Sequence, residues 1–153
     1  MRITTKGRYA VRALLNLAAT AGDRPKPIRR IAAEEEISPE FLEQIFFRLK
    51  RSGILSSTRG PGGGFRFARP LDQVSLAQVF VAVGEGLDLT PCTSCGTAEA
   101  SESCERSDEC LAHHVWNKTS AYIVEFFESM TIASILAEHA DRAAELFAEP
   151  AEA

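Results

Sequence analysis

The chain alternates between stretches with helical periodicity and stretches without it. Apolar residues recur every three or four positions in five stretches, each of which predicts a helix: residues 4–20, 28–37, 38–53, 75–84 and 111–129. Thr131 is a candidate cap for a last short helix, and the Ala- and Glu-rich tail beyond it is expected to fray. Two short segments, residues 54–59 and 64–68, are typical of strands. The pattern predicts a mainly α fold with one small β-hairpin.

The third of these helices is the best defined. Ser38 supplies an N-cap hydroxyl, Pro39 takes the first helical position, and Gly53 ends the helix. Its apolar residues should form one buried face: Phe41, Leu42, Ile45, Phe46 and Leu49. The connection to the preceding helix, at residues 36–38, is tight, so the two should form a helix-turn-helix, whose second helix can enter a DNA major groove.

Glycines dominate the segment between the two strands. The sequence Gly-Pro-Gly-Gly-Gly at residues 60–64 is flanked by Arg59 and Arg66. Glycine has no side chain and tolerates positive φ, so this tip can turn sharply and lie against a phosphate backbone. A nucleotide-binding P-loop is excluded because no Gly-Lys-Ser/Thr follows. A helix-turn-helix followed by a basic hairpin predicts a winged helix that binds DNA.

The charge distribution supports this interpretation. The net charge is −4, but residues 1–70 carry 14 Lys and Arg against 6 Asp and Glu, whereas residues 71–153 carry 3 against 15. The basic half coincides with the winged helix, where neutralising phosphates would release counterions. The acidic half should face away from the duplex.

Individual side chains can be assigned expected roles at the DNA. Gln44 can pair with adenine and Glu43 can accept from cytosine. Arg8 and Arg12 lie one helical turn apart, so they either direct two cations toward a phosphate or form a solvated face. The complete set of expected DNA contacts is Arg8, Ser38, Glu40, Glu43, Gln44, Arg48, Arg51, Ser57, Arg59, Gly60, Gly62, Gly63 and Arg66.

Other classes of protein are disfavoured. No run approaches the roughly 20 apolar residues of a membrane span, and the N-terminal stretch has no uninterrupted apolar segment, so a cytoplasmic protein without membrane contact is expected. The chain has no nucleotide motif and no Ser/His/Asp set, so it is not expected to be an enzyme. The helix at residues 111–129 carries several large apolar residues: Val115, Trp116, Ile123, Phe126 and Phe127. They are more large apolar residues than a peripheral helix needs to dock on so small a domain. A partner helix is therefore expected, which predicts a homodimer with two-fold symmetry.

All four cysteines fall in one polar, acidic segment without periodicity. The spacing is Cys92-x2-Cys95-x8-Cys104-x5-Cys110-x2-His113. Disulfides are disfavoured in a cytoplasmic chain, and the segment is too polar to bury ordinary cysteines. A metal site is therefore expected, and both zinc and an iron–sulfur cluster remain open. The wide spacing favours the cluster, because zinc usually takes two close-set pairs of ligands.

The segments MRITTKGRYAVRALLNLA and FLEQIFFRLKRSGILSSTRGPGGGFRF, together with the pattern C-x5-C-x2-H-x2-W, resemble the IscR-type regulators. These are iron–sulfur-sensing winged-helix repressors, and their wider family includes nitric-oxide and cysteine-metabolism sensors. The resemblance covers roughly residues 1–137. It implies a transcriptional regulator that holds a [2Fe–2S] cluster through three cysteines and a histidine.

The resemblance also implies which residues hold the cluster. Cys104, Cys110 and His113 match the last three ligands of the family directly. The first ligand is ambiguous, because the family's usual spacing places a cysteine where this chain has Ala98. We favour Cys92, which stands next to a helix end as the family's first cysteine does. Cys95 is the substitute, either in place of Cys92 or in a four-thiolate site without His113.

These expectations combine into one architecture and one function. The expected organisation is a winged helix-turn-helix domain (residues 1–86), a cluster-binding segment (87–113), a long dimerisation helix with a short last helix (114–140), and a tail (141–153). The expected function is an operator-binding regulator, a repressor, whose DNA binding depends on cluster, redox or iron status. The alternatives are a DNA-binding regulator with a structural zinc and a relative that senses nitric oxide or cysteine metabolism. Relatives that sense nitric oxide use a carboxylate ligand on the first helix, and Arg8 and Arg12 occupy that helix here.

Overall fold

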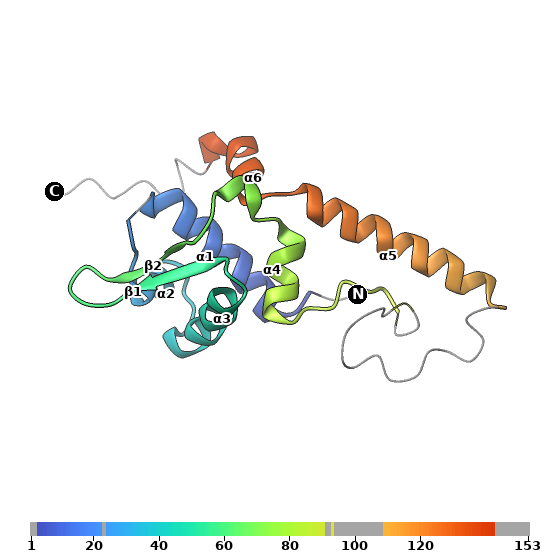
Figure 1. The fold of residues 1–153 in the computed structure, drawn as a ribbon, viewed down its shortest axis with the longest axis horizontal. Coiled ribbons are helices and arrows are strands. Elements are labelled where there is room, and N and C mark those ends of the chain that lie inside the picture. Colours follow the sequence, from blue (N-terminus) through green and yellow to red (C-terminus); the bar gives the residue numbers. More distant parts are fainter. Residues whose placement is uncertain (1–2, 23, 91–92, 94–108, 143–153) are drawn as a thin grey trace.

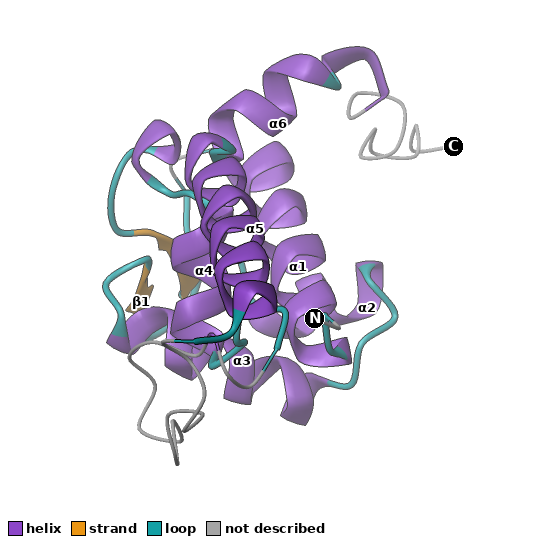
Figure 2. Ribbon diagram, turned by 90° about the vertical axis from the view of Figure 1, so that its right-hand side faces the viewer, coloured by secondary structure: helices purple, strands orange, loops and turns teal. Residues whose placement is uncertain are grey.

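The computed structural model describes residues 3–22, 24–90, 93 and 109–142. The elements follow in the order α1 (Thr5–Ala21), α2 (Ile28–Glu34), α3 (Pro39–Arg51), β1 (Leu55–Thr58), β2 (Gly64–Phe67), the 3-10 turn η1 (Leu71–Gln73), α4 (Leu76–Val83), α5 (Leu111–Ser129) and α6 (Ile132–Glu138). Figure 1 shows a helical body with the hairpin at one side and α5 extending away from it, and Figure 2 shows that helices dominate the body. The mainly α fold with a β-hairpin wing is confirmed. None of the described helices is both long and apolar enough to cross a membrane.

The core lies where α1, α3, α4 and α6 meet. Leu14, Phe46, Val79 and Ile132, one from each helix, are fully buried. On α3 the expected face is confirmed for Leu42, Ile45, Phe46 and Leu49, whereas Phe41 is only partly buried. This packing fixes one side of α3 inside the body and leaves the opposite side to solvent.

Side-chain caps set the helix starts that the sequence predicts. Ser38 Oγ accepts from the Phe41 amide N–H at 3.2 Å at the start of α3. At the start of α4, Ser75 and Gln78 form a reciprocal capping box, and the Ser75 side chain and the Gln78 side chain each accept from the other's amide at 3.3 Å. Thr131 forms the same kind of box at α6. These local signals explain why the predicted starts of α3, α4 and α6 agree with the structure, whereas α2, predicted to reach residue 37, ends at Glu34.

The wing is a two-stranded antiparallel hairpin. Leu55 lies opposite Phe67, and Thr58 opposite Gly64, so the turn spans residues 59–63. Phe65 packs edge-on against Phe46 of α3 with ring centroids 5.1 Å apart, which ties the hairpin to the core. A Cβ on Gly64 would lie 2.3 Å from the backbone of Lys26, so the hairpin can approach the segment before α2 only through glycine.

The C-terminal end of α5 is held against the body. The Leu76 amide donates to the Met130 carbonyl, and the Ile132 amide donates to the Val74 carbonyl, both at 2.9 Å. Phe127 packs edge-on against Phe80 of α4 with centroids 5.1 Å apart. Part of the apolar surface of α5 is therefore used within the chain, and the rest stays exposed along the length of the helix.

Several expectations fall on residues that the structure leaves out. Cys92, Cys95 and Cys104 lie outside the described residues, as does the tail after residue 142. Residues 140–142, at the start of the tail expected to fray, are helical. The ligand roles of the three cysteines therefore stay predictions.

Candidate nucleic-acid interface and metal ligands

The solvent side of α3 borders an open groove of about 950 Å³. Its lining comes almost entirely from α3, with one residue of α4: Glu40, Glu43, Gln44, Phe47, Arg48, Arg51, Ser52 and Ala82. Five of the expected DNA contacts therefore share one surface, because positions three and four residues apart lie on the same side of a helix. Ser38 stands at the N-terminal end of the helix as its cap.

A hydrogen bond joins this helix to the wing. The Lys50 ammonium donates to Ser57 Oγ at 2.6 Å, from the last turn of α3 to β1. Ser57, an expected DNA contact, is thus placed next to the end of α3. Lys50 adds a cation between the helix and the hairpin.

The tip of the wing is exposed and strongly turned. Gly60 has φ of 99° and Gly62 has φ of 76°, a left-handed region that favours glycine. Arg59, just before the tip, is exposed. Arg66 is also exposed but borders a different groove, together with Ser56 and Arg69. The structure therefore does not place Arg66 in the groove of α3.

The two arginines of α1 behave differently from each other. Arg8 is exposed, and its Nη2 donates to Thr5 Oγ1 at 3.2 Å. The Arg12 guanidinium instead donates to the Glu35 carboxylate at 3.1 Å and to the Glu35 carbonyl at 2.6 Å, and it lies 5.4 Å from the centroid of the Tyr9 ring. Of the two roles left open for Arg12, a phosphate contact beside Arg8 or a solvated face, the structure shows neither directly: Arg12 bonds to Glu35 and holds α1 to the helix-turn-helix turn.

A buried polar cluster lies beneath the same turn, and it was not predicted from the sequence. The side chain of Lys26 is only 6% exposed, and its ammonium donates to Asn16 Oδ1 at 2.9 Å, to Thr20 Oγ1 at 2.7 Å and to the Glu34 carboxylate. Asn16 Nδ2 in turn donates to Glu34 and to Glu35. Every charge in the cluster has a partner, as burial requires. The cluster connects α1, the segment before α2, and α2 itself.

The carboxylate of Glu34 is the titratable group that this cluster perturbs. Burial on its own would raise its pKa, but hydrogen bonds from Lys26, Asn16 and Arg30 hold the pKa of Glu34 below its ordinary value. The charged form is thus favoured in the folded protein.

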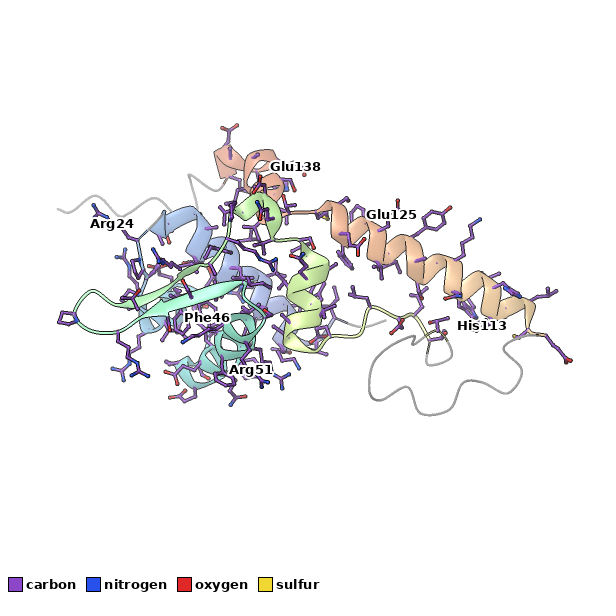
Figure 3. The ribbon with its side chains drawn as sticks, viewed as in Figure 1. Arg24, Phe46, Arg51, His113, Glu125 and Glu138 are labelled. Carbon is purple, nitrogen blue, oxygen red and sulfur yellow. The ribbon has the colours of Figure 1, made fainter. Side chains whose placement is uncertain are left out.

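Two of the expected metal ligands lie within the described residues, at the start of α5. Cys110 is the residue that precedes the first turn and has a free, half-buried thiol. The His113 amide donates to the Cys110 carbonyl at 3.0 Å, which places the two side chains about one turn apart. His113 Nδ1 is buried and has no hydrogen-bond partner among the residues that the structure describes. Figure 3 shows His113 toward the end of α5 that extends away from the body.

The donor set fits a metal centre. A buried imidazole nitrogen without a hydrogen bond is costly, and a metal ion would satisfy it. Thiolate and imidazole are ligands that zinc and iron–sulfur clusters both accept. Cys110 and His113 are only two ligands, and no group of three or more His, Cys, Asp or Glu that could hold a metal occurs in the described part of the chain. Any further ligands to such a centre would have to come from outside the described residues.

The segment that leads toward the cysteines is anchored at both sides. The Leu89 amide donates to Ser120 Oγ of α5 at 3.2 Å, and the buried hydroxyl of Thr93 lies 3.4 Å from the same oxygen. Upstream, the Glu85 carboxylate accepts from the Thr4 amide at 3.2 Å, at the start of α1. These contacts link the segment to both the winged helix and α5.

Comparison with known proteins identifies the chain. A family model described as "Rrf2: Iron-dependent Transcriptional regulator" matches residues 3–138. The chain belongs to the Rrf2 family. It is therefore a DNA-binding transcriptional regulator, and the expectation that it is not an enzyme is confirmed.

Curated regulators named IscR match most of the chain. It is 40% identical over 136 residues to the HTH-type transcriptional regulator IscR of Sodalis glossinidius, covering 89% of this chain and 79% of the relative. The IscR of Yersinia enterocolitica is 38% identical over the same length, with the same coverage. The resemblance to IscR-type regulators is confirmed.

Solved structures support the fold. The structure of T. potens IscR matches with a TM-score of 0.71 and 27% identity, over 93% of this chain and 90% of that one. The global cysteine regulator CymR of B. subtilis matches with a TM-score of 0.70 at 22% identity, over 90% of this chain and 98% of that one. The second likeness concerns the fold alone.

Proposed function

We propose that this chain is a homodimeric, operator-binding repressor whose DNA binding is controlled by a [2Fe–2S] cluster. Cys92, Cys104, Cys110 and His113 would hold the cluster, with Cys95 as the substitute for Cys92. The regulator would report on cluster, redox or iron status. The observation that carries the proposal is that Cys110 lies one turn before His113, whose buried Nδ1 has no hydrogen-bond partner among the described residues.

DNA recognition is assigned to α3 and the wing. The groove along α3 offers Gln44 and Glu43 to base edges, and Arg48 and Arg51 supply cations beside them. Arg59 at the wing tip would reach the minor groove or a phosphate. The hydrogen bond between Lys50 and Ser57 supports a fixed angle between the two contacting elements.

An exposed apolar row along α5 supports the dimer. Leu111, Val115, Tyr122 and Phe126 are all more than half exposed, and their spacing of four, seven and four residues places them along one side of the helix. A row of large apolar side chains on an isolated helix is a surface that a second helix would cover. Two-fold pairing of α5 would then bring two α3 helices to successive half-sites of an operator.

The cluster would supply a redox-active iron centre that is lost when its ligands are oxidised or its metal is removed. Cys110 would ligate as thiolate and His113 through the neutral ring nitrogen. Glu85 bonds to Thr4 beside α1 and Leu89 bonds to Ser120 of α5, so a cluster held by the cysteines that follow Leu89 would adjust how α5 sits on the winged helix. That adjustment would set the spacing between the two α3 helices of a dimer.

The test is anaerobic purification of the full chain with analysis of iron, acid-labile sulfide and visible absorbance. The proposal expects equal iron and sulfide, a coloured protein, and colourless but folded Cys92→Ala, Cys104→Ala and Cys110→Ala variants. Cys95→Ala and His114→Ala should stay coloured. His113→Ala should hold the cluster weakly, and His114→Ala is its matched control. A colourless protein with bound zinc would overturn the cluster assignment. If Cys95→Ala is colourless and Cys92→Ala stays coloured, Cys95 rather than Cys92 is the first ligand.

A further inference from the structure

Phe47 is an aromatic side chain on the solvent side of the recognition helix. It is 60% exposed, and it belongs to neither the buried core nor the partly buried residues packed against it. The neighbouring Phe46 fills the core completely. Because α3 already buries a full apolar face, Phe47 contributes little to the packing of the described fold.

The position of Phe47 is among the polar groups that face the groove. It follows Glu43 by four residues and Gln44 by three, and all three line the same groove of about 950 Å³. The guanidinium of Arg51, one turn further, lies 5.9 Å from the centroid of the Phe47 ring. Figure 3 shows Arg51 on the outer side of α3, away from the core.

The surroundings of Phe47 indicate a nucleic acid as its partner. Arg48 and Arg51 line the groove together with the carboxylates of Glu40 and Glu43, and Lys50 is a further cation in the last turn of α3. An apolar ring among cations suits a surface that is polyanionic at its edge and carries apolar groups inside. The major groove of DNA has phosphates at its rim and, on its floor, one apolar group, the C5-methyl of thymine.

We propose that Phe47 is a specificity-determining residue that contacts the C5-methyl group of a thymine in each operator half-site. A phenyl ring has no hydrogen-bond donor or acceptor, so it distinguishes thymine from the other bases only through that methyl. Arg51, stacked near the ring, would keep it in place while its cation faces the backbone. The inference rests on the placement of α3 in the major groove, which is part of the proposed function.

The experiment uses the full chain and a duplex obtained by selecting its preferred site from a random-sequence library. Each thymine of that site is replaced in turn by deoxyuridine, which lacks only the methyl. Affinities of the parent and Phe47→Ala are measured at one salt concentration. At one thymine of each half-site, deoxyuridine should weaken binding of the parent about three- to fivefold, the effect of losing one buried methyl. The same replacement should not affect Phe47→Ala.

Two further variants complete the design. Phe47→Leu keeps an apolar side chain and should retain part of the thymine preference. Val81→Ala removes a side chain on α4 that is 70% exposed and lies outside the groove of α3, and it should preserve the parent's preference fully. All three variants should unfold at the parent's denaturant concentration.

The outcomes separate this inference from the function on which it rests. If the parent selects a site but shows the same thymine preference as Phe47→Ala at every position, the role of Phe47 is refuted and operator binding stands. If the parent selects no sequence at all, operator recognition by α3 fails, and the inference fails with it.

Discussion

The backbones of Lys26 and Phe65 pair with each other in both directions, each amide donating to the other's carbonyl at 2.9 Å. The segment before α2 thereby forms an additional edge on the wing hairpin. The ammonium of Lys26 points inward and donates to Asn16, Thr20 and Glu34. Lys26 therefore connects the wing, through its backbone, with the buried polar cluster under the helix-turn-helix turn.

The Lys26 side chain should matter for stability. Lys26→Met keeps the length of the side chain but leaves Glu34 and Asn16 without their buried partner, so the free energy of unfolding should fall by about 1–3 kcal/mol. Arg30→Ala is the matched control, because Arg30 bonds to the same carboxylate at 2.9 Å from an exposed position. It should cost less than about 1 kcal/mol. Urea unfolding measures the free energy of unfolding of both variants. Equal losses in the two would show that the burial of Lys26 does not add to stability.

Stability should also depend on pH through Glu34. The pKa of Glu34 is lower in the folded protein than its ordinary value of 4.5. Its contribution is therefore fully present above that ordinary value and is lost as pH falls through the lowered pKa. In Glu34→Gln the fall in unfolding free energy below about pH 5 should be shallower than in the parent. If the unfolding free energies of the two proteins fall equally with pH over this range, the role assigned to Glu34 is contradicted.

The turn of the helix-turn-helix contains a strained residue. Glu36 has φ of 54°, the one described position other than glycine with positive φ. An L-residue in this region costs about 1 kcal/mol or more, which glycine avoids, so Glu36→Gly should raise the free energy of unfolding by about 1 kcal/mol. Gly53→Ala makes the opposite change. Gly53 has φ of 73°, and a Cβ there would meet no described atom within 4 Å, so only backbone strain should lower the free energy of unfolding. A destabilised Glu36→Gly would show that its side chain, rather than its backbone, is what matters.

Local signals made much of the fold predictable. The start of α4 follows from Ser75 and Gln78, which lie three residues apart and cap the helix by themselves. The groove of α3 was also foreseeable, because Glu43, Gln44, Arg48 and Arg51 alternate with a strictly apolar face. Such features depend on neighbours in the sequence, and the structure reproduces them.

Features that depend on distant partners were not predictable in the same way. Lys26 stands between two prolines and would be expected in solvent, yet it is buried because Asn16 and Glu34 converge on it. The i, i+4 spacing places Arg12 on the same face as Arg8, but it does not reveal that Arg12 bonds to Glu35, 23 residues away. Phe47 could have been found, since it continues the series of Glu43 and Arg51 at intervals of four residues. It was overlooked because it adjoins the core residue Phe46.

The wing tip should contribute directly to operator affinity. Arg59→Ala should weaken binding by about 1–3 kcal/mol, the size of one lost specific contact, because its exposed guanidinium would reach the minor groove or a phosphate. Arg142→Ala, which removes an exposed arginine beyond α6, is the control for charge and should have little effect. Gel-shift titration at fixed salt measures both. Unchanged affinity for Arg59→Ala would mean that the hairpin does not touch DNA.

The central claim is that the metal centre at the start of α5 controls DNA binding by α3 and the wing. The most direct measurement is anaerobic titration of one operator duplex with the cluster-loaded protein, the same protein after chelation, and Cys110→Ala. Coupling between two sites typically changes affinity by about 5- to 150-fold. The account predicts a change of at least about fivefold on chelation, with Cys110→Ala matching the chelated protein. Identical operator affinities for all three proteins would contradict it.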